Sequence, residues 1–407
     1  MIFSNVRPGS IIIAKPYRFV PPYRGTFWTT FFRPFGRAMA RRLFGVTKVE
    51  IRGGHHLRDS VARGDGILIA SNHCRHSDPF LLGLLNAESG QPLHVMATWH
   101  LFNQGLLLAL LLRRIGAFSV YREGPDRVAL KTAVALLAEA RRPLVIFPEG
   151  MASRSNHYLR PFMDGLALIA RAAARQRSVT GGGIAVHPVA IRYRFEGAID
   201  TTLAPRLEKL EMHIGWPPGR DASLLARAFK MGEELLARAE EKHFGARRSG
   251  AAPQRMAALI EHLLVPLETK WLGAPGDGES FARMKRVRGA ILPALIAGSL
   301  SETEIKQRWN ELALIDEAER WYRNPPTHLV SCATPEQLLE TVERIEEMMM
   351  GRARPCGPLR AVIDVDPPIK LGGEPAIVIG ANELLEQIRT RMEAMLVEER
   401  RPQPAST

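Results

Sequence analysis

Three side chains that can bind a proton, a metal ion or an electrophile lie close together in the segment SNHCRHSDPF, residues 71–80. They are His73, Cys74 and His76, and Asp78 follows them. When a carboxylate holds one nitrogen of an imidazole, the other nitrogen is free to take a proton. His73 and Asp78 are therefore a candidate general-base pair, acting on a hydroxyl group.

Three other interpretations of this segment stay open on these residues alone. Asp78 precedes a proline and an apolar run, so its side chain is also a candidate helix N-cap. His73, His76 and Cys74 are a weaker candidate metal site, because such closely spaced residues of one loop rarely converge on an ion. Cys74 beside a histidine is a weak candidate nucleophile, since adjacent side chains point apart.

A second group of polar residues follows the apolar run LVIF at 144–147. Glu149, Gly150, Ser153 and Arg154 come directly after it, and Arg122 ends the segment GAFSVYR. Arginine binds phosphate with two parallel hydrogen bonds. We expect Glu149 to face a cleft shared with His73, and Arg122 and Arg154 to bind an anionic group there. On its own, each of these features also fits an ordinary turn or a local ion pair.

The elements around these motifs alternate between strands and helices. Short apolar runs predict strands at 67–70, 93–97, 117–121, 144–147 and 184–193, with helical stretches between them. This alternation predicts an α/β layer structure. Both motifs follow strands, at the carboxyl ends where open α/β sheets bind their ligands.

The sequence pattern changes beyond about residue 220, where apolar residues recur every three or four positions. This spacing predicts amphipathic helices. The segment 273–279 is a candidate linker, and the short runs at 361–368 and 376–379 are candidate edge strands. The pattern does not indicate what this region does.

The charge balance favours an anionic partner, since 55 Lys and Arg residues face 42 Asp and Glu residues and give a net charge of +13. No nucleic-acid-binding motif is visible, so no nucleic-acid partner is expected and a membrane is the better candidate. An ordinary solvated basic surface is the alternative. The three cysteines are too few for a disulfide framework and indicate a reducing compartment.

Two apolar segments are candidate membrane-docking elements. The stretch 26–45 interleaves phenylalanines and a tryptophan with arginines, a composition typical of membrane interfaces, although these aromatics also suit packing on a core. The run GLLLALLL at 105–112 is too short to span a bilayer. We find no signal peptide and no spanning segment, so we expect a peripheral or monotopic protein.

Taken together and in this order, the motifs resemble the four sequence blocks of the glycerolipid acyltransferase family. The matching segments are NHCRHSD, GAFSVYR, FPEGMASR and VHPVAIRY, supported by LRPFMDGLALIA at 159–170. The resemblance covers roughly residues 45–215. Its first and third blocks are the most specific.

This resemblance, together with the sequence pattern outside it, predicts a fold, a domain order and a set of site residues. The fold is α/β, a mixed sheet flanked by helices, with a mainly helical C-terminal extension. The domains are a docking segment at 1–45, an acyltransferase domain at 46–218 and a helical region at 219–407. The implied site consists of catalytic His73 and Asp78, supporting Asn72, and substrate-binding Arg122, Glu149, Gly150, Ser153 and Arg154.

The resemblance also implies the reaction. A fatty acyl group passes from acyl-CoA or acyl carrier protein to a hydroxyl of a lysophospholipid, with lysophosphatidic acid giving phosphatidic acid as the favoured case. Neither a metal nor a bound cofactor is expected, and the site faces the cytoplasmic side of a membrane. The alternatives are an acyltransferase for glycerol 3-phosphate or an aminolipid, and an inactive membrane-associated scaffold.

Several finer expectations follow from the same resemblance. Glu149 accepts hydrogen bonds from glycerol hydroxyls or holds an arginine, and backbone N–H groups near Gly150 or after Asp78 stabilise the oxyanion. Met151 and Met163 depart from the family pattern, because the family often has a Thr-Arg-Ser stretch at 151–153 and a lysine at 163. Both departures remove cations from the region where an acceptor phosphate is expected.

Overall fold

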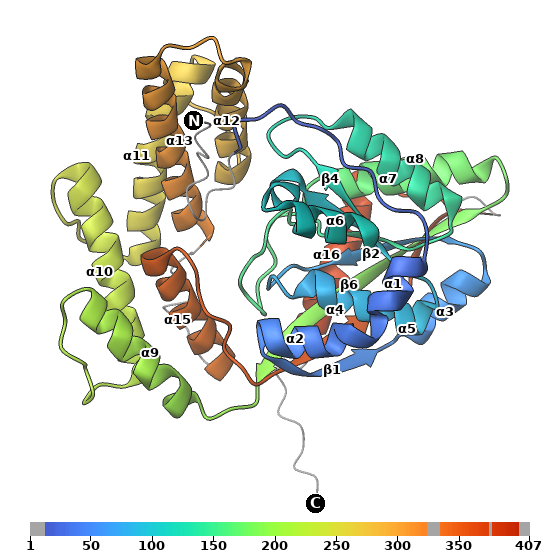
Figure 1. The fold of residues 1–407 in the computed structure, drawn as a ribbon, viewed down its shortest axis with the longest axis horizontal. Coiled ribbons are helices and arrows are strands. Elements are labelled where there is room, and N and C mark those ends of the chain that lie inside the picture. The colour runs from blue at the N-terminus through green and yellow to red at the C-terminus, as the bar shows by residue number, and fades with distance from the viewer. Residues whose placement is uncertain (1–12, 324–333, 374–376, 399–407) are drawn as a thin grey trace, which may run out of the picture. The chain divides into compact units, whose positions relative to one another are not determined.

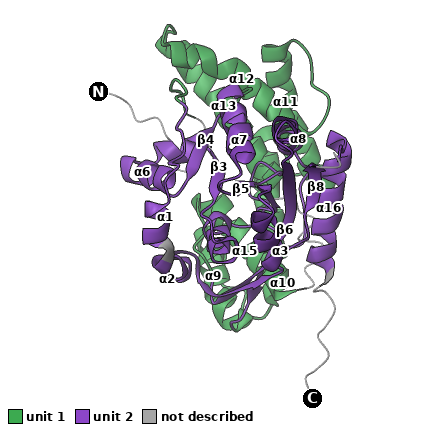
Figure 2. Ribbon diagram, turned by 90° about the vertical axis from the view of Figure 1, so that its right-hand side faces the viewer, with its two compact units in different colours: residues 1–18, 122–125, 198–356 green, residues 19–121, 126–197, 357–407 purple. Residues whose placement is uncertain are grey.

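The computed structural model of the chain describes residues 13–323, 334–373 and 377–398. The chain forms two compact units, which are coloured separately in Figure 2. The sheet unit takes residues 19–121, 126–197 and 357–407, and the helical unit takes residues 1–18, 122–125 and 198–356.

The sheet unit, drawn as a ribbon in Figure 1, is built on one mixed sheet of eight strands. Their order is β1-β7-β6-β2-β5-β3-β4, with β8 paired to β6. β6 runs antiparallel to β7 and β8, and the other neighbouring pairs are parallel. The strands are β1 (Val46–Arg52), β2 (Gly66–Ser71), β3 (His94–Thr98), β4 (Ala117–Val120), β5 (Leu144–Ile146), β6 (Gly183–Phe195), β7 (Leu359–Val365) and β8 (Ile369–Gly372). This confirms the predicted mixed α/β sheet.

Helices flank this sheet, and three of them share an apolar core with it. α7 (Arg127–Glu139), α8 (Gly165–Ser178) and α16 (Ala381–Glu398) bury their apolar residues together with those of β2, β5, β6 and β8. All six residues of β2 are buried, as expected for a central strand with both faces covered. The remaining helical elements are α1 (Phe27–Phe32), η1 (Arg33–Phe35), α2 (Gly36–Phe44), α3 (His55–Ala62), α4 (Asp78–Leu82), η2 (Gly83–Leu85), α5 (Asn86–Ser89), η3 (Trp99–Asn103) and α6 (Leu106–Arg114).

The five strands predicted between residues 67 and 193 are present, whereas β1 and β8 were not predicted, and one candidate edge strand has a different place in the sheet. The run at 361–368, a candidate edge strand, forms most of β7, and β7 lies inside the sheet between β1 and β6. The apolar run that forms β7 was visible in the sequence. Its neighbours in the sheet are set by long-range pairing, which periodicity does not reveal. Of the other candidate strand, 376–379, Ile377 makes a single bridge to Gly372, and residue 376 lies outside the described part of the chain.

The described part of the helical unit contains α9 (Ile199–His213), α10 (Leu224–Phe244), α11 (Ala252–Leu272), α12 (Ser280–Ala297), α13 (Glu302–Arg323) and α15 (Pro335–Met350). α10 to α13 share one apolar core. The candidate linker 273–279 is the connection between α11 and α12 inside this unit. The region 219–407 is mainly helical, as predicted, but its last part, from residue 357, belongs to the sheet unit.

No helix among the described residues is long and apolar enough to cross a bilayer.

Candidate active site

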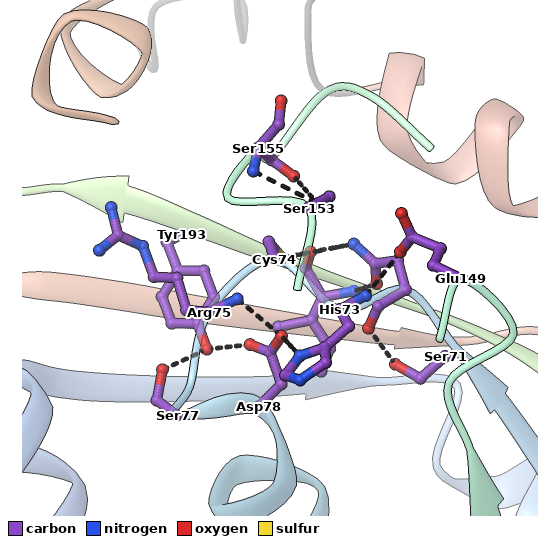
Figure 3. A network of polar contacts seen from close by, with 12 residues as sticks. Ser71, His73, Cys74, Arg75, Ser77, Asp78, Glu149, Ser153, Ser155 and Tyr193 are labelled. Atoms are coloured by element: carbon purple, nitrogen blue, oxygen red, sulfur yellow. Dashed lines mark hydrogen bonds and ion pairs between the residues drawn. The ribbon is translucent and has the colours of Figure 1, made fainter. Parts of the chain in front are cut away.

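His73 and Asp78 form the hydrogen bond that the sequence analysis expects (Figure 3). His73 lies two residues beyond the end of β2, and its Nδ1 is 2.8 Å from Oδ2 of Asp78. The imidazole also stacks on Phe147, with 4.2 Å between ring centroids. The side chain of His73 is 16 % exposed, whereas that of Asp78 is fully buried. This arrangement fixes the imidazole through Nδ1 and leaves Nε2 as the nitrogen for proton transfer.

Asp78 does not cap the helix that it begins. The N-cap position of α4 is Ser77, and no side-chain cap is made there. Instead, Oδ2 of Asp78 accepts from the backbone N–H of Arg75 at 2.8 Å, in addition to the imidazole of His73. The carboxylate thus holds the loop that carries His73, and the helix-cap interpretation is wrong.

Tyr193 completes this group, and the sequence analysis missed it. Its hydroxyl donates to Oδ1 of Asp78, and Ser77 Oγ lies 2.6 Å from the same hydroxyl (Figure 3). Burial, and then the neighbouring charge of Asp78, raise the pKa of Tyr193 well above its usual value, so the phenol stays protonated and remains a donor. The available signal was its position at the end of the fourth motif block, in an apolar strand that otherwise needs no hydroxyl.

Glu149 joins the two motif loops, but it does so from inside the protein. Its Oε1 accepts from the backbone N–H of His73 at 2.8 Å, and its Oε2 accepts from the backbone N–H of Arg160 at 2.9 Å. The residue is 2 % exposed. The two loops therefore converge as expected, whereas the carboxylate does not face a cleft. Both oxygens bind backbone groups rather than an arginine side chain or an open surface.

Burial raises the pKa of Glu149 to about 7, against the opposing effect of the two N–H donors. The group is thus poised to change its charge near neutral pH. The loop that it holds is also fixed from the other side, because Arg389 of α16 donates to the carbonyl oxygens of Arg160 at 3.0 Å and Leu159 at 3.1 Å.

Asn72 supports the site by extending the sheet with its side chain. β2 pairs with β6 up to Ser71 opposite Val189, and the amide of Asn72 then takes the place of a backbone group. Its Oδ1 accepts from the N–H of Ile191 at 2.7 Å, and its Nδ2 donates to the carbonyl of Ile191 at 3.0 Å. The chain can therefore leave the sheet here while β6 keeps its hydrogen bonds.

Asn156 repeats the same arrangement two residues further along β6. Its Nδ2 and Oδ1 bind the carbonyl and the N–H of Tyr193, each at 2.9 Å. This contact ties the loop after Glu149 to the strand residue that holds Asp78. It is a second supporting residue that the sequence analysis did not single out.

The remaining residues of the second motif shape its loop. The N–H of Ser153 donates to the carbonyl of His73 at 2.6 Å, and Ser153 Oγ bonds within the loop to Ser155 at 3.2 Å. Gly150 has a φ of 69°, and an added Cβ would lie 2.4 Å from Sδ of Met163. Arg154 is half-buried and has a φ of 57°, which is uncommon for a residue other than glycine.

Arg122 belongs to the helical unit rather than to the sheet unit that holds His73. Its guanidinium lies over the ring of Phe281, 5.3 Å from the centroid. Burial lowers its pKa to about 10, and the carboxylates of Glu319 and Glu123 partly offset that effect.

Cys74 is fully buried, and its Sγ lies 3.1 Å from the carbonyl oxygen of Ile191. A thiol enclosed in this way is not placed to attack a substrate, which disfavours the nucleophile interpretation. The described residues contain no group of three or more His, Cys, Asp or Glu side chains arranged to hold a metal ion.

The two expected sources of oxyanion donors are engaged in this structure. The N–H of Gly150 donates to Phe147 at 3.1 Å, and at the start of α4 the N–H of Phe80 donates to Ser77 at 3.0 Å. Pro79, between Asp78 and Phe80, has no N–H to offer.

A histidine held by a buried carboxylate, at the carboxyl end of a central strand in a mixed α/β sheet, is an arrangement suited to general acid–base catalysis. Comparison with protein families identifies the class of protein. Residues 48–192, from β1 into β6, match the family model described as Acyltransferase. This segment is an acyltransferase domain of the glycerolipid acyltransferase family, and the protein is an acyltransferase. No curated protein matches the chain.

Proposed function

We propose that the protein transfers a fatty acyl group from an acyl thioester to a hydroxyl of a lysophospholipid, with lysophosphatidic acid as the acceptor and phosphatidic acid as the product. The observation that carries this proposal is the hydrogen bond of 2.8 Å between His73 and the buried Asp78 within the acyltransferase domain. An imidazole fixed in this way is suited to activate a hydroxyl.

The proposed reaction needs no acyl-enzyme. Nε2 of His73 takes the proton of the acceptor hydroxyl, and the hydroxyl oxygen forms a new ester bond with the thioester carbonyl carbon. The carbon–sulfur bond then breaks, and the thiolate of coenzyme A or acyl carrier protein leaves with a proton returned by His73. Asp78 holds Nδ1 and stabilises the imidazolium that forms between these steps. Arg122 and Arg154 are the proposed ligands of the anionic head group, as the family resemblance implies.

We further propose that the sheet unit docks on the cytoplasmic face of an anionic membrane. Phe27, Phe31 and Phe35 of the α1–η1 segment, and Leu106 and Leu107 of α6, are all exposed. Scattered apolar side chains are normal on a surface, but these form two neighbouring groups.

Further contacts link these two apolar groups to each other and to the site. The guanidinium of Arg114 in α6 lies 4.7 Å from the ring centroid of Trp28 in α1. Arg37, Arg41 and Arg42 of α2 are exposed beside the aromatic group. α2 also packs on the helix that begins with Asp78, through Phe44 and Phe80 at 5.2 Å between centroids. A lipid surface bound there would lie near the catalytic loop.

The test is acyl transfer by the purified full-length protein, with labelled acyl-CoA and a panel of lysolipids, glycerol 3-phosphate and aminolipids. Transfer to lysophosphatidate that falls by a factor of roughly 10² to 10⁴ in His73→Ala supports the proposal. Equal transfer by wild type and variant refutes the role of His73. Preference for another acceptor in the panel refutes the choice of lysophosphatidic acid.

A further inference from the structure

Two cations of the helical unit share one aromatic ring. The guanidinium carbon of Arg122 lies 5.3 Å from the ring centroid of Phe281, and Nζ of Lys285 lies 5.9 Å from the same centroid. Phe281 is buried and stacks on Tyr322, so the ring is fixed. Contact with a ring face attracts each cation but removes none of its charge.

The nearby carboxylates are already paired with other arginines. Arg288, which is buried, binds Glu123 at 2.9 Å and also forms an ion pair with Glu319. Glu319 forms a second ion pair with Arg323. Glu123 and Glu319 are therefore in ion pairs with Arg288 and Arg323. They act on Arg122 and Lys285 only at longer range.

The charge left over resides on Arg122 and Lys285. Nη2 of Arg122 is enclosed and has no hydrogen-bond partner among the described residues. Burial lowers the pKa of Lys285, and the nearby charge of Arg122 lowers it further. An enclosed donor without an acceptor is costly, and two like charges in one half-buried place add to that cost. An anion that contacts both cations would relieve both costs.

We propose that Arg122 and Lys285, arranged around Phe281, bind one phosphate monoester group of a ligand. Such a group carries a charge of roughly −1.5 to −2 at neutral pH, which complements two cations. An arginine fork and a lysine ammonium are both suited to phosphate oxygens. Lys285 lies on α12, outside the residues that match the acyltransferase family, so this second cation is supplied by the appended helical unit.

Two ligands of the proposed reaction carry a phosphate monoester. They are lysophosphatidic acid, in its head group, and coenzyme A, in its 3′-phosphate. The choice between them rests on the proposed function, whereas binding of the phosphate itself does not. Inorganic phosphate is therefore the first probe, followed by glycerol 3-phosphate, coenzyme A and dephospho-coenzyme A.

The test is isothermal titration calorimetry on the full-length protein and three variants. Lys285→Gln removes the charge and is expected to weaken phosphate binding by about tenfold or more, whereas Lys285→Arg retains a cation and stays within about threefold. The matched control is Arg286→Gln on the same helix, because Arg286 is exposed and donates to the carbonyl of Asp277 instead. It is expected to bind phosphate like the wild type.

The outcomes separate the possibilities. Tighter binding of glycerol 3-phosphate than of inorganic phosphate supports the site with an acceptor ligand, and tighter binding of coenzyme A than of dephospho-coenzyme A supports it with the donor. No saturable phosphate binding by the wild type, or equal affinity in Lys285→Gln, overturns the site. If His73→Ala retains acyl transfer, the proposed function is overturned. The phosphate site is then judged by the phosphate titration alone.

Discussion

The hydroxyl of Tyr193 donates a hydrogen bond to the carboxylate of Asp78, on the oxygen that His73 does not use. The phenol comes from β6, and the imidazole from the loop after β2, so adjacent strands supply the two partners of one buried carboxylate. Asp78 is thereby fixed in rotation as well as in position. Because the carboxylate sets the orientation of the imidazole, the order of the whole group depends on Tyr193, which is buried and contacts Asp78.

Tyr193→Phe is therefore expected to lower kcat by roughly tenfold while leaving KM nearly unchanged. The ring remains to fill its place, and the change removes only a hydrogen bond to a charged group, which is worth about 1.5–3 kcal/mol. Ser77→Ala is the matched control, since it removes a bond to the phenol but leaves the bond to Asp78. Steady-state kinetics of both variants decide the point. A wild-type kcat in Tyr193→Phe would contradict the positioning role.

Glu149 is expected to make stability depend on pH in an unusual direction. Its pKa is about 7 in the folded protein and about 4.5 when unfolded, so the folded state holds the extra proton between these values. The contribution of this group is fully present below pH 4.5 and is lost as the pH rises through 7. The loss is on the order of 3 kcal/mol.

Urea unfolding of the wild type and Glu149→Gln at pH 5 and pH 8 measures this effect. The amide cannot ionise, so the variant lacks this source of pH dependence, although it loses one acceptor for the N–H groups of His73 and Arg160. The variant is expected to be the less stable protein at pH 5, and the difference is expected to shrink by pH 8. Parallel changes in the two proteins would show that Glu149 does not titrate in this range.

The sequence predicted the parts of this site that depend on local pattern. The strands around His73 and Glu149 were visible as apolar runs. The residue types made His73 and Asp78 a candidate pair, and the family resemblance favoured that pair over the alternatives. The sequence did not reveal the partners supplied by β6. Tyr193 and Asn156 act through hydrogen bonds to residues far away in the sequence. The periodicity of apolar residues does not report such contacts. The burial of Glu149 was missed for the same reason. Its two carboxylate oxygens accept from backbone N–H groups of two separate loops, those of His73 and Arg160.

The exposed leucines of α6 are expected to contribute to membrane binding. Leu106→Gln together with Leu107→Gln leaves the fold intact, because these side chains are 86 % and 82 % exposed. Burying a leucine side chain in lipid is worth about 1.5–3 kcal/mol, so partial insertion of two gives at least a tenfold loss of binding. Flotation with vesicles containing anionic lipid measures it. The control is Val179→Ser, an 87 % exposed residue at the end of α8. Equal flotation of the double variant and the wild type would rule out docking through α6.

Gly150 offers the sharpest test of how the second motif loop is built. Gly150 and Gly90 share a φ of 69°, but an added Cβ at Gly150 meets Sδ of Met163 at 2.4 Å, whereas one at Gly90 meets nothing within 4 Å. Gly90→Ala therefore reports the backbone cost alone, about 1–2 kcal/mol. Gly150→Ala adds the clash and displaces the loop that carries Ser153, whose N–H holds the carbonyl of His73.

The expected result is a larger loss of stability in Gly150→Ala than in Gly90→Ala, with a fall in acyl transfer in Gly150→Ala only. Met163→Ala in the Gly150→Ala background removes the clashing sulfur and is expected to restore part of both losses, leaving the backbone cost. The wild type, Gly150→Ala, Met163→Ala and the double variant form a double-mutant cycle. Thermal unfolding and acyl transfer are measured for all four proteins. Equal destabilisation at both glycines, with no recovery in the double variant, would show that Met163 does not fix the conformation of this loop.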